Sequence, residues 1–464
     1  MTPLYWDSAT VLSRKFASRQ SSPVELLETL LARIAALEPK INVFIHLDAE
    51  GAMSAARAAE RELAAGRGRG PLHGIPMGIK DNIDVAGLPM TCHSKILLEN
   101  KPSKDATVVK RLRDEGAIIL GKLSMHEFAT GAASFDLPCP PARNPWNRDY
   151  HPGGSSSGSG AGLAIGFFPL ALGTDTGGSV RNPASACGVV GLKPTYGLVS
   201  RRGVFPLAFT LDYVGPMART VADVAVLLDA SASQDPADPG SVTGPIGSYS
   251  ADLGGGVRNL RIGFVRHFHE IDMPAELEVA TALDEVARVL TAEGASVRPI
   301  TLPNLNVFFT VNRVILQSEA WAVHAHNLRT RPGDYGETAR RRLLTGAFLS
   351  AEDYVQAQRQ RARLIAAVQD AFRDVDILLT ANSMNTTCRI DDAEAIARTL
   401  PRQARTPFNV TGHPAVTMMA GLSKAGLPLG VQFVGRYFED STVLRVAAAY
   451  EHATSWHSQH PPEL

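Results

Sequence analysis

Three polar residues stand in sequence contexts that could support nucleophilic catalysis. Lys80 lies in the apolar stretch GIPMGIKDNI. Lost hydration in such a strand lowers the pKa of an ammonium group and favours the neutral amine, which is a usable base. Ser155 and Ser179 each follow a pair of glycines. Glycines before a serine let several backbone N–H groups point at one spot, as a developing oxyanion requires.

Each of these residues also has a plain structural interpretation. A Gly-Gly-Ser stretch can be a simple turn, and Lys80 can reach water at a strand end or pair with Asp81. None of the thirteen histidines offers an obvious base: His73 precedes a strand, and His126 lies in a helical run. From the residues alone, the choice between catalysis and structure stays open.

The glycine-rich stretches also raise the question of a phosphate-binding loop. The Walker pattern needs a lysine directly followed by Ser or Thr after its last glycine. Here Gly162 is followed by Leu-Ala, and Gly178 by Ser-Val-Arg. The dinucleotide fingerprint is matched only loosely at 158–160, with Leu163 in place of its last glycine. The sequence therefore disfavours nucleotide binding.

The elements that must position these residues follow from hydrophobic patterning. From about residue 72 to 230, short apolar runs alternate with glycine-rich turns, which predicts an α/β fold with a largely buried sheet. A capping serine and Pro23 begin a helix that Pro39 is expected to end. The other predicted helices cover 48–65, 107–115, 156–168, 275–293, 329–370 and 441–454. The predicted strands cover 75–83, 117–123, 170–176, 261–265, 295–300, 374–380 and 428–435.

Composition narrows the function classes. The chain has 464 residues, of which 45% are apolar, and its 46 basic side chains balance 46 acidic ones. Without a positive field, neither nucleic acid nor an anionic membrane is an expected partner. The start has no apolar run of signal-peptide length, and four widely spaced cysteines show no metal-ligand spacing. We therefore expect free thiols and a cytoplasmic location.

A long ordered set of motifs resembles the amidase signature family, from about residue 20 to 455. The motifs include LHGIPMGIKDNIDVAGLPMT, GAIILGKLSMHEFATG, RNPWNRDYHPGGSSSGSGAG, LALGTDTGGSVRNPASACGVVGLKPTYGLVS and LDYVGPMARTVADVA. The resemblance implies a single α/β/α domain around a large mixed, twisted sheet. Within it, 1–65 would form N-terminal helices, 66–230 the signature core, and 231–464 the remaining strands and pocket helices.

The same resemblance implies roles for individual residues. Lys80, Ser155 on a cis peptide and the nucleophile Ser179 would form a catalytic triad. The oxyanion hole would consist of backbone N–H groups of Thr176, Gly177, Gly178 and Ser179. Asp175 and Arg181 would hold the nucleophile loop as an ion pair. The reaction implied is hydrolysis of an amide through an acyl-enzyme on Ser179.

Substrate choice is expected to rest on 134–141 and on the helical region 305–350. The substrate-binding candidates are Thr130, Gly131, Phe135 and Leu316. Apolar side chains in these segments suggest a small-molecule amide, carbamate or urea with an apolar or aromatic part. No metal or organic cofactor is implied, so a chelator is expected to leave activity unchanged, and a homodimer is compatible with this interpretation.

The main alternative is the glutamine-hydrolysing component of a tRNA-dependent amidotransferase. Such a component would share the triad but pass ammonia to a partner. These proteins usually carry a different segment where this chain has AASFDLPCPPA. We therefore favour a stand-alone amidase from the sequence.

Overall fold

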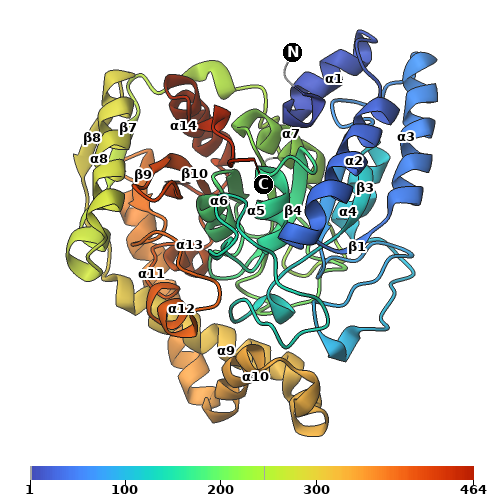
Figure 1. Ribbon diagram of the computed structural model, residues 1–464. Helices are drawn as coiled ribbons and strands as arrows, with labels where there is room; N and C mark the ends of the chain where they lie inside the picture. The colour runs from blue at the N-terminus through green and yellow to red at the C-terminus, as the bar shows by residue number, and fades with distance from the viewer. Residues whose placement is uncertain (1–2, 245, 464) are drawn as a thin grey trace.

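One large mixed sheet organises the computed structural model, which describes residues 3–244 and 246–463 (Figure 1). Its eleven strands follow the order β1-β3-β2-β4-β6-β5-β10-β11-β9-β7-β8. The strands are β1 (Phe44–Leu47), β2 (Pro76–Lys80), β3 (Ile118–Leu123), β4 (Leu170–Asp175), β5 (Val190–Lys193), β6 (Tyr213–Ala218), β7 (Arg261–Phe264), β8 (Ser296–Pro299), β9 (Ile377–Ala381), β10 (Ala415–Leu422) and β11 (Pro428–Gly435). Because strands from both ends of the chain share this sheet, the protein is a single α/β domain.

The sheet combines parallel pairs towards both of its ends with antiparallel pairs in its middle. Strand β2 runs parallel to β3 and β4, and β7 runs parallel to β8 and β9. The pairs β4–β6, β5–β6, β5–β10, β10–β11 and β9–β11 are antiparallel. This mixed sheet confirms the predicted fold class.

Helices cover both faces of the sheet. The helices are α1 (Ala9–Ala17), α2 (Pro23–Ile41), α3 (Ala49–Ala64), α4 (Thr107–Asp114), α5 (Ser157–Ala164), α6 (Arg181–Cys187), α7 (Val221–Ser231), α8 (Leu277–Ala292), α9 (Leu305–Thr330), α10 (Glu337–Leu344), α11 (Ala351–Ala371), α12 (Ala393–Thr399), α13 (Thr406–Thr411) and α14 (Asp440–Ala453). In β4, Leu170 and Leu172 join the buried cluster that contains α7, whereas Ala171 joins the cluster that contains α5. Alternate side chains of one strand therefore reach opposite layers, as the pleat requires.

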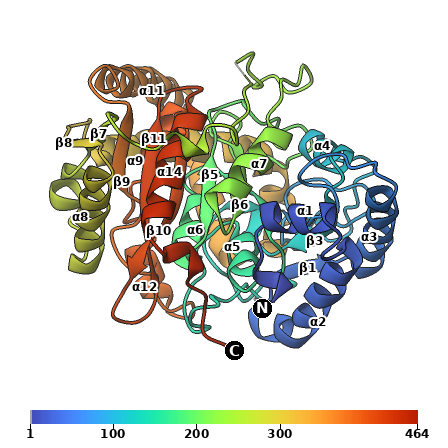
Figure 2. The same cartoon turned by 90° about the horizontal axis from the view of Figure 1, so that it is seen from above.

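The molecule is broad along the direction in which the strands are stacked. Seen from above, α1, α2 and α3 lie at one side, and α8 with β7 and β8 lies at the other (Figure 2). Helices α9 and α10 lie together at the bottom of the first view (Figure 1). Both helices contribute residues to the outer wall of the candidate active site.

Two local predictions were wrong for identifiable reasons. Helix α2 continues past Pro39 to Ile41, because Ile41 is fully buried and Asn42, in the left-handed region, donates its N–H to the Glu38 carbonyl. The predicted helix over 329–370 is instead the end of α9 followed by α10 and α11, since Pro332 interrupts the pattern.

The region 1–65 contains more than helices. Strand β1 lies within it and pairs antiparallel with β3 at an edge of the sheet. Strands β5, β6 and β10 were also absent from the prediction, because Gly and Pro in them obscure the apolar pattern. Within the described ranges, all four cysteines are free, and no helix is long and apolar enough to cross a membrane.

Candidate active site

The sheet brings the lysine and the two serines to one edge. Lys80 is the last residue of β2, and Ser179 lies just beyond the end of β4, between that strand and α6. Since β2 and β4 are parallel, their carboxyl ends meet at the same edge. Ser155 lies two residues before α5. Ser155 and Ser179 line one cavity, and Lys80 contacts Ser155 from behind.

Lys80 is held by three oxygen atoms. Its Nζ lies 2.7 Å from Ser155 Oγ, 2.7 Å from Thr174 Oγ1 and 3.3 Å from the Thr174 carbonyl oxygen. Asn82 donates a further hydrogen bond of 3.1 Å to Thr174 Oγ1. Lys80 is fully buried and Ser155 is 2% exposed. The amine is therefore aimed at one serine hydroxyl and shielded from water.

Burial favours the neutral form of the Lys80 amine. Desolvation lowers the pKa of Lys80 to about 7, against the opposing charges of Asp175 and Asp212. Both protonation states of the amine are thus accessible near neutral pH. A group of this kind can accept and return a proton, which is the requirement for a general base.

Backbone contacts join the loops of the two serines. The peptide bond between Gly154 and Ser155 is cis. Ser156 donates its N–H to the Ser179 carbonyl over 3.1 Å, and His126 donates its N–H to the Ser155 carbonyl over 3.0 Å. The relative position of the serines is therefore set by the main chain.

A buried carboxylate organises the loop that carries Ser179. Asp175 Oδ1 accepts the N–H of Gly178 at 2.8 Å, and Oδ2 accepts the N–H of Val180 at 3.0 Å. The Gly178 N–H is thus engaged within the protein, which argues against its predicted place in an oxyanion hole, and the N–H groups of Thr176, Gly177 and Ser179 stay predictions.

An ion pair fixes this carboxylate. Arg181 Nη2 lies 2.9 Å from Asp175 Oδ1, and both side chains are fully buried. Burial opposes the charged form of Asp175, but Arg181 and hydrogen bonds outweigh it and hold the pKa of Asp175 well below its ordinary range. Arg181 also donates to Gln432 Oε1 and Asn409 Oδ1, each at 2.6 Å. The predicted ion pair is confirmed, and it ties the loop to distant segments.

A second carboxylate supports the other end of the loop. Asp212 Oδ1 accepts the hydroxyl of Thr176 at 2.6 Å, while Oδ2 accepts the N–H groups of Leu207 and Ala208. Burial raises the pKa of Asp212 to about 6 despite these hydrogen bonds. Asp212 does not line the cavity, so it positions Thr176 from behind.

A cavity of about 600 Å³ opens in front of the serines. Among the predicted substrate-binding residues, Thr130, Gly131 and Leu316 line it. Phe135 does not: this side chain is 55% exposed, with the Arg143 guanidinium 5.4 Å from its ring centroid. The prediction for Phe135 was wrong, because its loop carries it to the surface instead of into the cavity.

The cavity wall is more polar than the predicted apolar pocket. The polar residues of the lining that lie outside the sequence-based candidates include Asn312, Arg313, Gln317, Arg342 and Arg405. The first three come from α9 and Arg342 from α10, so distant helices complete the site. Charged residues on an amphipathic helix are typical of a solvated face, and no local signal marks these as cavity residues.

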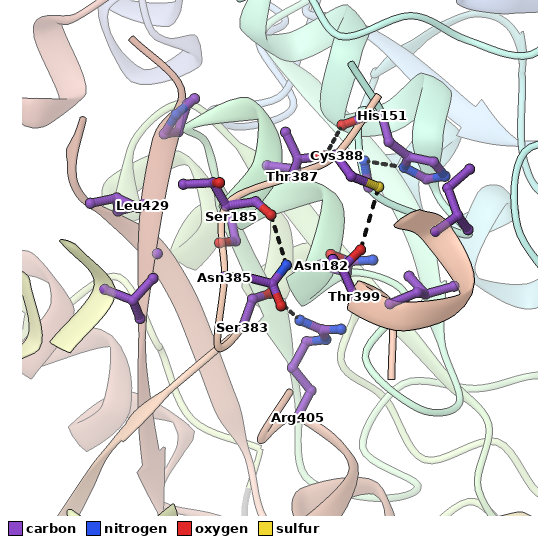
Figure 3. A pocket seen from close by; sticks show the side chains of 18 residues that line it. His151, Asn182, Ser185, Ser383, Asn385, Thr387, Cys388, Thr399, Arg405 and Leu429 are labelled. Atoms are coloured by element: carbon purple, nitrogen blue, oxygen red, sulfur yellow. Dashed lines mark hydrogen bonds between the residues drawn. The ribbon is translucent and has the colours of Figure 1, made fainter. Parts of the chain in front are cut away.

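A second, smaller cavity of about 50 Å³ adjoins the first. Both are lined by Asn182, Leu400 and Arg405. Figure 3 shows Arg405 below Ser383 and Asn385, with Cys388 and His151 at the far end. Arg405 Nη1 donates to Ser383 Oγ at 2.6 Å and to Asn382 Oδ1 at 2.9 Å. The Nη1 atom of Arg405 is therefore held by residues outside the main cavity, although Arg405 lines both cavities.

Comparisons with known proteins agree on one family. The family model described as Amidase matches residues 25–444. The A subunit of the glutamyl-tRNA(Gln) amidotransferase of Roseiflexus castenholzii is 40% identical, covering 99% of this chain and 98% of that protein.

Solved structures give the same result. One, described as part of a vestigial complex that reveals the origins of an s-triazine catabolic enzyme, is 33% identical with a TM-score of 0.91. The match covers 96% of this chain and 98% of that one. The native peptide amidase of Stenotrophomonas maltophilia is 31% identical with a TM-score of 0.87, covering 98% of each chain.

Proposed function

Because the chain belongs to the amidase family, and its relatives act on carbon–nitrogen bonds, we propose that it hydrolyses a carboxamide through an acyl-enzyme on Ser179. Ser155 and Lys80 relay protons in this proposal. The observation that carries it is the 2.7 Å contact between a fully buried Lys80 amine and the Ser155 hydroxyl, with Ser179 on the wall of the same cavity.

The proposed reaction proceeds in two halves. Neutral Lys80 accepts the proton of Ser155, and Ser155 accepts the proton of Ser179, whose Oγ attacks the carbonyl carbon. The oxyanion receives hydrogen bonds from the backbone N–H groups of Thr176, Gly177 and Ser179. The proton returns through Ser155 to the leaving nitrogen, and the C–N bond breaks. Water, deprotonated along the same relay, then releases the acid and restores Ser179.

Two substrates are candidates within this chemistry. The similarity to the glutamyl-tRNA(Gln) amidotransferase protein, at 40% identity over nearly the whole chain, favours glutamine hydrolysis with a partner that takes up the ammonia. The similarity to a peptide amidase favours a stand-alone enzyme acting on another amide. The curated relatives support the glutamine candidate over our sequence-based preference.

Ammonia release from a panel of amides separates these candidates. The panel comprises glutamine, aliphatic and aromatic primary amides, a carbamate and a biuret-type urea, with Ser179→Ala as the blank. Turnover of glutamine alone would identify the amidotransferase component, and turnover of another class would identify a stand-alone amidase. A Ser179→Ala protein with near wild-type turnover would refute the proposed nucleophile. The cytoplasmic location and the homodimer stay predictions, testable by fractionation and light scattering.

A further inference from the structure

We propose that Arg313 and Arg342 form an anion subsite, and that the substrate is a small amide that carries a carboxylate and no ammonium group. This inference rests on the proposed function, because it names the substrate class of the Ser179 site. It also separates the two candidate substrates by their charge.

The two arginines lie on the wall that faces the catalytic serines. Arg313 comes from α9 and Arg342 from α10, and both line the cavity that contains Ser155 and Ser179. Arg342 Nη1 donates to the Gly131 carbonyl at 3.0 Å, which anchors this guanidinium at the cavity wall. The α9 helix is itself placed against the nucleophile loop.

The positive charge of this wall has no compensating carboxylate. Among the cavity-lining residues that the structure describes, none is Asp or Glu. Burial lowers the pKa of Arg342, and the charge of Arg313 lowers it further. Two like charges that weaken each other in this way bind an anion well, because the anion removes their repulsion.

Two nearby exposed arginines have carboxylate partners. Arg341, next to Arg342 in α10, lies 3.1 Å from Glu337, and Arg331 lies 2.7 Å from Asp334. The cavity arginines Arg313 and Arg342 are in no ion pair among the described residues. Arg313 and Arg342 are exposed on the cavity wall without a carboxylate partner, so an anion bound in the cavity would have two guanidinium groups to contact.

A third polar group strengthens the case for a polar ligand. Gln317 is 7% exposed and lines the cavity one turn after Arg313 on α9. Its Oε1 has no hydrogen-bond partner within the described part of the chain. A buried amide without a partner loses free energy unless a ligand satisfies it. Arg405, which also lines the cavity, is held at Nη1 by Asn382 and Ser383, whereas its Nε has no hydrogen-bond partner in the described part of the chain.

The same charges disfavour glutamine. Its carboxylate suits Arg313 and Arg342, but its ammonium group would enter a cavity that has cationic residues and, within the described chain, no acidic one. Glutaramate, the monoamide of glutaric acid, has the same chain without the ammonium group. We therefore expect glutaramate, or a homologue of different length, to bind more tightly than glutamine.

Calorimetric titration of the Ser179→Ala protein tests the anion subsite in the absence of turnover. The ligands are succinamate, glutaramate and adipamate, their neutral counterparts propionamide, butyramide and valeramide, and glutamine. We expect at least one acid amide to bind ~10-fold or more tightly than its neutral counterpart, as a charge-assisted contact provides. Equal affinities within each pair would overturn the subsite, and tightest binding of glutamine would overturn the exclusion of an ammonium group.

Substitution of each arginine tests whether that residue binds the carboxylate of the acid amide. Arg342→Gln and Arg313→Gln should each weaken binding of the preferred acid amide ~10-fold and leave its neutral counterpart unchanged. In the active enzyme, the same variants should raise KM for the acid amide more than they lower kcat. Arg341→Gln, on the same helix but paired with Glu337 and outside the cavity lining, should match the unaltered protein. Equal losses for acid and neutral ligands would indicate a structural role and refute the subsite.

The outcomes also separate this inference from the proposed function. Ser179-dependent hydrolysis of butyramide without preference for an acid amide would leave the amidase function standing and refute the subsite. Selective binding of acid amides with no Ser179-dependent turnover of any amide would support the subsite and refute the proposed reaction.

Discussion

Arg181 and Asp175 form a fully buried ion pair, 2.9 Å apart, beneath the loop that presents Ser179. Through Asp175 the pair orients the N–H groups of Gly178 and Val180, and through Arg181 it reaches Asn409 and Gln432. The nucleophile loop thus takes its shape from residues more than 200 positions away.

Removal of one partner of this pair should destabilise the whole protein. Arg181→Met leaves a buried, unpaired carboxylate, which typically costs about 3–5 kcal/mol. We expect a loss of this size in the free energy of unfolding, measured with urea, together with a loss of amidase activity. Arg341→Gln breaks only an exposed pair with Glu337 and should change stability by less than about 0.5 kcal/mol. Similar stabilities for the two variants would contradict the role assigned to the pair.

Substitution of the nucleophile should abolish turnover without unfolding the protein. Ser179→Ala removes only a half-buried hydroxyl. By comparison with other catalytic serines, kcat should fall by up to about 10⁶-fold. Thermal unfolding should stay close to that of the unaltered protein, and a fluorophosphonate, which phosphonylates a nucleophilic serine, should label the protein only when Ser179 is present. Labelling of Ser179→Ala at the same rate would place the nucleophile elsewhere.

The pH profile should report the titration of Lys80. Burial lowers its pKa to about 7, and the neutral amine is the base in the proposed reaction. On a neutral amide substrate, kcat/KM should therefore rise with pH through about 7 and level off above it. Lys80→Met should lose this limb together with most of the activity, whereas Lys110→Met, at an exposed pair with Asp114, should keep the profile. If the rise of kcat/KM with pH persists unchanged in Lys80→Met, another group must cause it.

The lowered pKa of Lys80 should also make the free energy of unfolding rise with pH. In the unfolded chain Lys80 titrates near its ordinary value of 10.5, well above its folded value of about 7. Between these values the unfolded state binds more protons, so this residue makes stability rise with pH across that window. The difference in unfolding free energy between the unaltered protein and Lys80→Met should follow this rise. A difference that is flat from about pH 7 to 10 would contradict the lowered pKa.

Gly178 should tolerate no side chain. Its φ of 118° disfavours L residues, and an added Cβ would lie 2.5 Å from Nε and 2.6 Å from Cδ of Arg405. Gly178→Ala should destabilise the protein by roughly 1–3 kcal/mol. At Gly177 the nearest atom to an added Cβ is 3.8 Å away, so Gly177→Ala should leave the unfolding free energy nearly unchanged. Equal losses at both positions would refute the steric argument.

Local patterns singled out Lys80, Ser155 and Ser179 as candidates, and the resemblance to the amidase signature family gave them their predicted catalytic roles. The apolar neighbours of Lys80 predicted its burial, and the double glycines before Ser155 and Ser179 indicated loops that approach another atom closely. These features depend on residues adjacent in the chain, so they can be read without a fold. The alternation of apolar runs and turns predicted the α/β class for the same reason, although β1, β5, β6 and β10 were overlooked.

The sequence by itself therefore determined the family and the fold class, and it singled out the residues proposed as base and nucleophile. Only the tertiary structure decided which side chains face that nucleophile: it removed Phe135 from the cavity and placed Arg313 and Arg342 in it. The physical reason is that a cavity wall forms between helices that pack over long sequence separations. On an isolated helix, an arginine that lines such a wall has the same pattern as one that faces water.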